Sequence, residues 1–118
     1  MAYVDGFVLP LPKSNIEAYR KVATDAGAVW KDHGALDYHE CIADDVKPGK
    51  LTSFPQSVNL EEGETVVFAW IVYKSREHRD EVNAKVMADP RITGMDPAKM
   101  PFDGKRMIYG GFETLVQV

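Results

Sequence analysis

Residues 64–73, ETVVFAWIVY, carry apolar side chains on both faces of a predicted β-strand. Side chains alternate along a strand, so the segment has two apolar rows. The rows are Val66, Phe68, Trp70 and Val72, and Val67, Ala69, Ile71 and Tyr73. A sheet with helices on one face and water on the other alternates apolar with polar residues instead. This strand therefore needs a covering layer on each face.

The rest of the chain predicts the order of the elements. Three more strands are expected at residues 3–11, 36–43 and 105–116, which are rich in β-branched and aromatic residues. Helical spacing of apolar residues predicts two helices, at residues 15–33 and 76–89. The order β-α-β-β-α-β is that of the ferredoxin-like α+β fold. In that fold two helices pack on one face of a four-stranded antiparallel sheet.

Polar residues mark the helix starts. Ser14 and Glu17 have the spacing of a capping box for the first helix, and Ser75 precedes the second. The charge-rich stretch SREHRDE, residues 75–81, is expected to be a solvated helix face.

Residues 44–63 are too long for an ordinary hairpin between adjacent strands. Pro48 and Gly49 mark a turn within them. The apolar residues of this segment are Leu51, Phe54, Val58 and Leu60. We therefore expect an ordered arm that packs on another part of the protein.

Length and composition narrow the class of protein. The chain has 118 residues, which predicts one domain, residues 1–118, with a core of its own. Its only cysteine cannot form an internal disulfide, and the N-terminus lacks the pattern of a signal peptide, so a cytoplasmic location is expected. No stretch is apolar enough for a membrane span. The net charge of −4 argues against nucleic-acid binding.

A second subunit is the simplest layer for the second face of the sheet, because no sequence remains in the chain to cover it. We therefore expect a homodimer with its two sheets face to face. Asp103 and Gly104 predict a turn before the last strand. Gly110 and Gly111 lie inside that strand, which indicates a bulge or a close backbone approach that bends the strand toward the partner.

Known motifs for cofactors and metals are absent. Gly104-Lys105 lacks the spacing of a phosphate-binding loop, and Gly110-Gly111 lacks that of a dinucleotide-binding loop. His39-Glu40 begins like a zinc-protease motif, but the second histidine is missing. We predict no metal and no cofactor.

One group of candidate catalytic residues comes from the first and last strands. Asp5 is an acid within an apolar strand, and it can approach Arg106 or Tyr109 because the first and last strands are neighbours in this fold. The alternative for Asp5 is a structural ion pair with an arginine. Arg106 either solvates a strand end or binds an anion.

A second group comes from the second strand and the tryptophans. His39 is a candidate acid or base, and Cys41 lies on the same strand face as a candidate ligand contact. Trp30 and Trp70 are candidate surfaces for a flat ligand. The alternative for all four residues is a purely structural role.

Three stretches resemble the YbaA-like family of small bacterial proteins of unknown function. They are YVDGFV at residues 3–8, ETVVFAWIVYKSREHRDEVNAKVMADPRI at residues 64–92 and KMPFDGKRMIYGGFE at residues 99–113. The similarity spans nearly the whole chain. The resemblance implies a dimeric α+β barrel, a fold whose members include cofactor-free monooxygenases, haem enzymes and small-molecule binders. It implies no particular catalytic residue.

Two functions remain open. The first is an enzyme, of the cofactor-free oxygenase or isomerase type, that acts on a small aromatic or carbonyl-bearing metabolite. The second is a non-catalytic dimer that binds a small molecule or serves in a stress response. An acid, a base and a cation that converge on one cavity would favour the enzyme.

Overall fold

The chain forms four strands and two long helices in the expected order. A computed structural model describes residues 1–118. The strands are β1 (Tyr3–Pro12), β2 (Asp37–Ile42), β3 (Glu64–Tyr73) and β4 (Ile108–Glu113). The long helices are α1 (Ile16–Asp32) and α3 (Arg76–Ala88). The short helical turns are η1 (Lys13–Asn15), α2 (Phe54–Ser57), α4 (Pro90–Thr93) and η2 (Pro97–Lys99).

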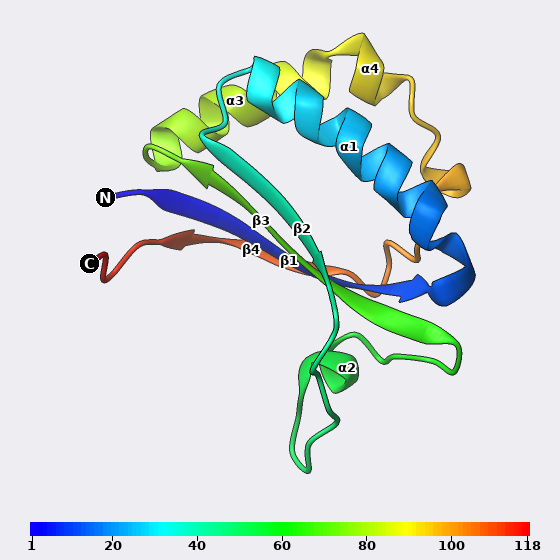
Figure 1. Ribbon diagram of the computed structural model, residues 1–118. Helices are drawn as coiled ribbons and strands as arrows, with labels where there is room; N and C mark the ends of the chain where they lie inside the picture. Colours follow the sequence, from blue (N-terminus) through cyan, green and yellow to red (C-terminus); the bar gives the residue numbers. More distant parts are fainter.

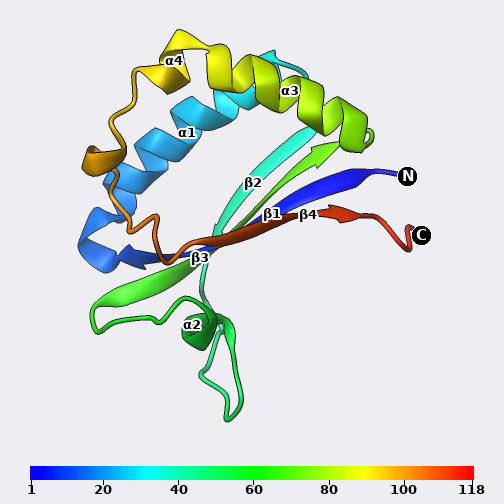
Figure 2. The same ribbon diagram turned by 180° about the vertical axis from the view of Figure 1, so that it is seen from behind.

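The strands form one antiparallel sheet in the order β2-β3-β1-β4. Helices α1 and α3 lie over the same face of this sheet, as Figure 1 shows and as the reverse view in Figure 2 confirms. The ferredoxin-like α+β arrangement predicted from the sequence is therefore confirmed. None of the helices combines the length and the apolar character that a membrane crossing requires.

Strand register determines which side chains face the helices. Val67 of β3 packs in a cluster with Leu9 of β1 and with Tyr19 and Ala23 of α1. Further along β3, Ile71 and Tyr73 pack in a second cluster with three valines of the helices, Val29, Val82 and Val86. This row of β3 is thus the one that the helices bury. The row with Val66, Phe68, Trp70 and Val72 is on the opposite, outer face.

The two helix starts differ in how they are capped. Ser75 caps α3, because its hydroxyl oxygen accepts a hydrogen bond from the backbone N–H of His78. At α1 the N-cap residue is Asn15, whose side chain makes no capping hydrogen bond. The predicted capping box is therefore wrong: the chain passes from β1 through the turn η1 into α1, and Glu17 binds Arg20 instead.

The glycine pair in β4 permits a close approach but forms no bulge. The pairing of β1 with β4 runs without interruption from Tyr3↔Glu113 to Val8↔Ile108, so the bulge alternative is wrong. A Cβ atom at Gly111 would lie 2.8 Å from Cε1 of Tyr3. Glycine is required here because the Tyr3 ring lies against the backbone, which confirms a close approach at Gly111. The bend of this strand toward a partner stays a prediction.

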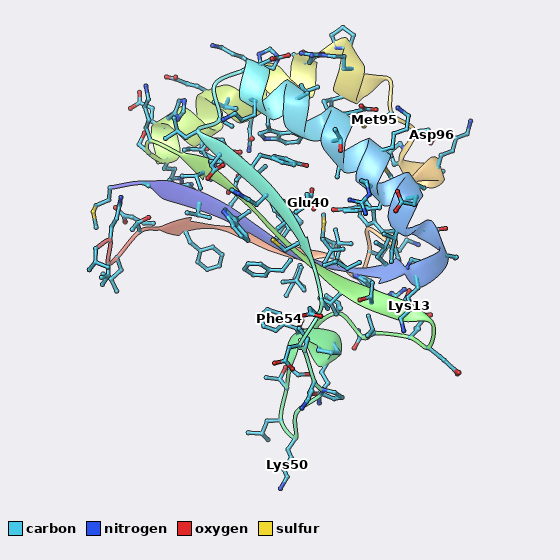
Figure 3. All side chains as sticks on the ribbon, viewed as in Figure 1. Lys13, Glu40, Lys50, Phe54, Met95 and Asp96 are labelled. Atoms are coloured by element: carbon cyan, nitrogen blue, oxygen red, sulfur yellow. The ribbon has the colours of Figure 1, made fainter.

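The segment 44–63 forms the predicted arm, which carries α2 on the side of the sheet away from α1 and α3 (Figure 1). Val58 is buried in a cluster with Val8 and Val66. Figure 3 places Phe54 between α2 and the sheet, and its ring lies 5.8 Å from that of Phe68. The arm therefore packs on the outer face, although Leu51 is 97% exposed.

Part of the outer face remains uncovered. Phe68 is 43% exposed, Ile108 is 46% exposed and Phe112 is 64% exposed. Together with Val4, Val8 and Trp70 they line a shallow apolar hollow. The arm thus covers only one end of the second apolar row of β3.

Arg106 is the centre of an ion-pair group that joins β3 to the turn before β4. Its guanidinium donates two hydrogen bonds to the carboxylate of Glu64, at 2.8 and 2.7 Å, and one to Asp103 at 2.9 Å. It also donates to the backbone carbonyl of Asn59. The hydrogen bonds from Arg106 lower the pKa of Glu64 below its ordinary value of 4.5.

We expect Glu64→Gln to lower the midpoint of thermal unfolding by several degrees at pH 7. The pKa of Glu64 is lower in the folded than in the unfolded protein, so its ionic contribution is complete above pH 4.5 and is lost as the pH falls through the folded pKa. The difference between wild type and variant should therefore shrink below about pH 4.5. Glu62→Gln, at an exposed position, is the control. An equal difference at pH 3 and pH 7 would contradict this account.

Candidate functional site

A cavity of about 580 Å³ lies between the sheet and the helices that cover it. Fifteen of its 22 lining residues are hydrophobic, which is the usual lining of a small-molecule site. Its floor includes Ala69 and Ile71 of β3, and Met100, Phe102 and Met107 line it from the segment before β4. Methionine side chains adapt readily to ligands of different shape.

Asp5 and Arg79 form an ion pair on the wall of this cavity. Nη1 of Arg79, on α3, donates a hydrogen bond to Oδ1 of Asp5 at 2.7 Å. Only 6% of Asp5 is exposed. Burial raises the pKa of Asp5, although the positive charge of Arg79 lowers it. Nε of Arg79 also donates to Asp80 at 2.8 Å, so two carboxylates share this guanidinium.

Trp30, Tyr73 and Asn83 form a hydrogen-bonded group next to this ion pair. The indole N–H of Trp30 lies 3.1 Å from both the hydroxyl of Tyr73 and Oδ1 of Asn83. The hydroxyl of Tyr73 also donates to Oδ1 of Asn83. Burial raises the pKa of Tyr73, and the adjacent charge of Asp5 raises it further. This group fixes one polar end of the cavity.

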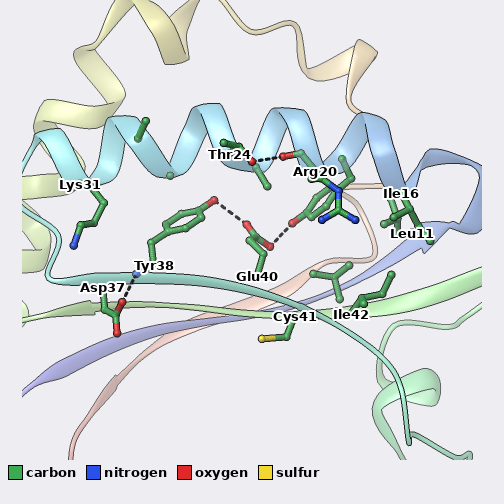
Figure 4. Close-up of a pocket in the computed structure, with 15 residues that line it drawn as sticks. Leu11, Ile16, Arg20, Thr24, Lys31, Asp37, Tyr38, Glu40, Cys41 and Ile42 are labelled. Atoms are coloured by element: carbon green, nitrogen blue, oxygen red, sulfur yellow. Dashed lines mark hydrogen bonds between the residues drawn. The ribbon is translucent and has the colours of Figure 1, made fainter.

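Glu40 and two tyrosines form the other polar end. The hydroxyl of Tyr19 donates to Oε1 of Glu40 at 2.6 Å, and that of Tyr38 donates to Oε2 at 2.8 Å. Figure 4 shows this carboxylate between helix α1 and strand β2. Burial and the charge of Glu40 raise the pKa values of both phenols, so both remain protonated donors at neutral pH.

Gly27 allows the ring of Tyr38 to lie against helix α1. A Cβ atom at this position would be 2.8 Å from two carbons of that ring. A mid-helix glycine costs about 1 kcal/mol relative to alanine. Because Gly27 has no side chain, the Tyr38 ring fits against α1 and its hydroxyl donates a hydrogen bond to Glu40.

The register of the sheet separates the two polar ends. Asp5 of β1 and Tyr38 of β2 both pair with Ile71 of β3, on opposite sides of that strand. Two interstrand spacings place their Cα atoms about 9–10 Å apart. The cavity is therefore an apolar trough with hydrogen-bonding groups at both ends.

Comparison with known proteins gives the family of the chain. A family model described as "Protein of unknown function (DUF1428)" matches residues 2–104. The chain belongs to this family. It is also 52% identical over 116 residues to "Uncharacterized protein YbaA" of Escherichia coli K12, and equally to that of Shigella flexneri, with 98% of each chain covered. The resemblance to the YbaA-like family is confirmed.

Two solved structures have the same fold as this DUF1428 chain. One is a NIPSNAP family protein with unknown function from Agrobacterium tumefaciens, at a TM-score of 0.56 and 18% identity over 94% of this chain and 86% of that one. The other is an uncharacterized NIPSNAP domain protein from Burkholderia xenovorans, at a TM-score of 0.56 and 13% identity over 95% of this chain and 93% of that one. At these identities the likeness concerns the fold alone.

Four of the candidate residues predicted from the sequence line the cavity in this family member. They are Asp5, Trp30, His39 and Tyr109, and the Tyr109 ring stacks on Phe7 with its centroid 6.2 Å away. Arg106 does not lie beside Asp5, because its guanidinium binds Glu64 and Asp103. The predicted approach of Asp5 to Arg106 is therefore wrong, and Arg79 takes that place.

The ring of His39 and the side chains of Cys41 and Trp70 lie on the outer face of the sheet, although His39 also borders the cavity. His39 stacks on Trp70 with ring centroids 4.8 Å apart, and Cys41 pairs with Phe68 in the register. Figure 4 shows Cys41 on the side of β2 opposite to Glu40. The sheet thus separates Cys41 and Trp70 from Asp5.

The residues that sequence reasoning missed are Tyr19, Tyr38, Glu40, Arg79 and Asn83. Alternation along β2 already placed Tyr38 and Glu40 on one face. Arg79 was assigned to a solvated helix face, but its side chain is only 18% exposed and turns toward β1. Spacing along α3 gives no sign of which charged residue turns inward. No group of three or more His, Cys, Asp or Glu side chains has the placement of a metal site.

Proposed function

We propose that this protein is a homodimer that binds a small, largely apolar aromatic metabolite in the cavity between sheet and helices. The observation that carries the binding proposal is the largely apolar lining, in which Asp5 and Glu40 belong to two separate hydrogen-bonded groups. Such a site binds a flat ligand through its faces and orients it through its ends.

Dimerisation is supported by the exposed part of the outer face. The apolar surface there comes from Phe68, Ile108 and Phe112. The helices α1 and α3 cover only the opposite face of the sheet. Two copies that meet through this face would bury both sets of residues in one isologous interface. In such a dimer the cavity of each subunit lies on the far side of its own sheet.

The dimer predicts a solution mass of twice 13.2 kDa by light scattering at micromolar concentration. Phe68→Glu should give monomers, because two copies of the new carboxylate would be buried at the interface without partners. Ala18→Glu adds the same charge at an exposed position of α1 and should leave the dimer intact. A monomeric wild type, or a Phe68→Glu variant that stays dimeric, would reject this interface.

Ligand binding in the cavity is tested with 2-methoxynaphthalene, a flat neutral probe. We expect it to raise the thermal unfolding midpoint of the wild type in proportion to its occupancy. Ala69→Leu adds three carbon atoms to the cavity floor and should abolish this shift. Ala84→Leu, at an exposed position of α3, is the matched control and should keep it. Equal shifts in both variants would place binding elsewhere.

Acid–base catalysis of the isomerase type is a second candidate function. It is favoured by the raised pKa of Asp5, a carboxylate on the cavity wall that can accept a proton from a bound substrate. A cofactor-free oxygenase that first removes a proton from its substrate would need the same base. In the alternative of a non-catalytic binder, Asp5 and Arg79 are only a structural ion pair.

Exchange of the α-protons of 2-tetralone in D2O, followed by NMR, separates catalysis from binding alone. If Asp5 is the base, the wild type should accelerate exchange and Asp5→Asn should not. The rate should fall as the pH falls through the pKa of Asp5, which lies above its ordinary value of 3.8. Glu62→Gln is the control. If Asp5→Asn still binds 2-methoxynaphthalene and exchanges the protons of 2-tetralone as fast as the wild type, the non-catalytic alternative is favoured.

A further inference from the structure

The hydrogen bonds around Glu40 indicate what kind of group a ligand presents at that end of the cavity. Both carboxylate oxygens already accept hydrogen bonds from phenols, those of Tyr19 and Tyr38. Each carboxylate oxygen has two lone pairs, so capacity remains for a further donor. The position thus accepts hydrogen bonds from aromatic hydroxyl groups within the protein itself.

Charge balance in the cavity disfavours anions. The charged side chains that line it are Asp5, Glu40 and Arg79, two carboxylates against one guanidinium. That guanidinium is already bound by Asp5 and by Asp80 outside the lining. A ligand carboxylate or phosphate would therefore meet negative charge without a free cation, which costs binding energy in a partly dry site.

Glu40 is also accessible from outside the cavity. A second hollow, of about 520 Å³, lies along the seam between α1 and β2. Tyr19, Tyr38 and Glu40 line both this hollow and the inner cavity. Figure 4 shows Tyr38 and Glu40 in the outer hollow. Two cations also line this outer hollow: Arg20 binds Glu17, and Lys31 donates to the backbone carbonyl of Leu36.

We infer that Glu40 is a specificity-determining residue that selects uncharged aromatic ligands with an O–H or N–H donor, such as phenols. The inference combines the two phenol hydrogen bonds, the negative charge of the cavity and the position of Glu40 between the two hollows. The inference rests on the proposed function, because it concerns the same cavity. Glu40 accepts the hydrogen bond of the ligand's donor, and the trough over Ala69 and Ile71 holds its ring. Aromatic carboxylates and phosphates are excluded.

Three flat probes of similar size test this selectivity by isothermal titration calorimetry. They are 2-naphthol, which has a donor, 2-methoxynaphthalene, which lacks it, and the anion 2-naphthoate. We expect 2-naphthol to bind about tenfold more tightly than 2-methoxynaphthalene, which is the minimum effect of one hydrogen bond to a charged group. 2-Naphthoate should bind most weakly.

Two variants assign the preference to Glu40. Glu40→Gln loses the charge and one of the two acceptor oxygens, so 2-naphthol should lose most of its advantage over 2-methoxynaphthalene, whereas Glu62→Gln should change neither affinity. Tyr38→Phe removes one internal donor but keeps the ring against Gly27. It should tighten binding of 2-naphthol severalfold and leave 2-methoxynaphthalene unchanged, a result that a merely structural role of Glu40 does not produce.

The outcomes separate the inference from the proposed function. If 2-naphthol and 2-methoxynaphthalene bind wild type equally, or 2-naphthoate binds most tightly, the selectivity is wrong but the cavity remains a binding site. If Glu40→Gln is folded and keeps the preference, another residue selects the donor. If none of the three probes binds, the proposed binding function fails and the selectivity fails with it.

Discussion

The fold depends on a central strand that is apolar on both faces. In β3 the row of Val67, Ala69, Ile71 and Tyr73 is buried by α1 and α3. The arm covers the other row at Val66, on which Val58 packs, and in part at Phe68, whose ring lies beside that of Phe54. Burial of apolar area is the main favourable contribution to folding, so the uncovered remainder of this row is the strongest constraint on how the protein assembles.

The same sheet separates the polar and reactive side chains of the protein into two sets, one on each face. Alternation along β2 directs Tyr38 and Glu40 to the helices and His39 and Cys41 to the outer face. The polar residues of the cavity therefore come from every layer: Asp5 from β1, Glu40 from β2, and Arg79 and Asn83 from α3. Because the strands are rigid, they fix the distance between the two polar ends, and the helices supply the partners that orient each carboxylate.

The fold could be predicted from the sequence because it depends on periodicity. The two rows of β3, the Ser75 cap and the order of elements are local patterns that the structure confirms. The site depends on contacts between distant residues. The pair of Asp5 with Arg79 joins residues 74 positions apart, and no local signal distinguishes Arg79 from its solvated neighbours. The role of Gly27 beside Tyr38 likewise appears only when helix and strand are packed.

The two carboxylates of the cavity have different environments. Asp5 is buried beside a cation, and burial favours its neutral form. Glu40 accepts two phenol hydrogen bonds at the seam between α1 and β2. Asp5 has the proposed role of proton acceptor and Glu40 that of hydrogen-bond acceptor. Because these residues and the exposed outer row lie on opposite faces of one sheet, the proposed assembly through Phe68 and the proposed binding over Ala69 involve adjacent residues of β3 without competing for the same surface.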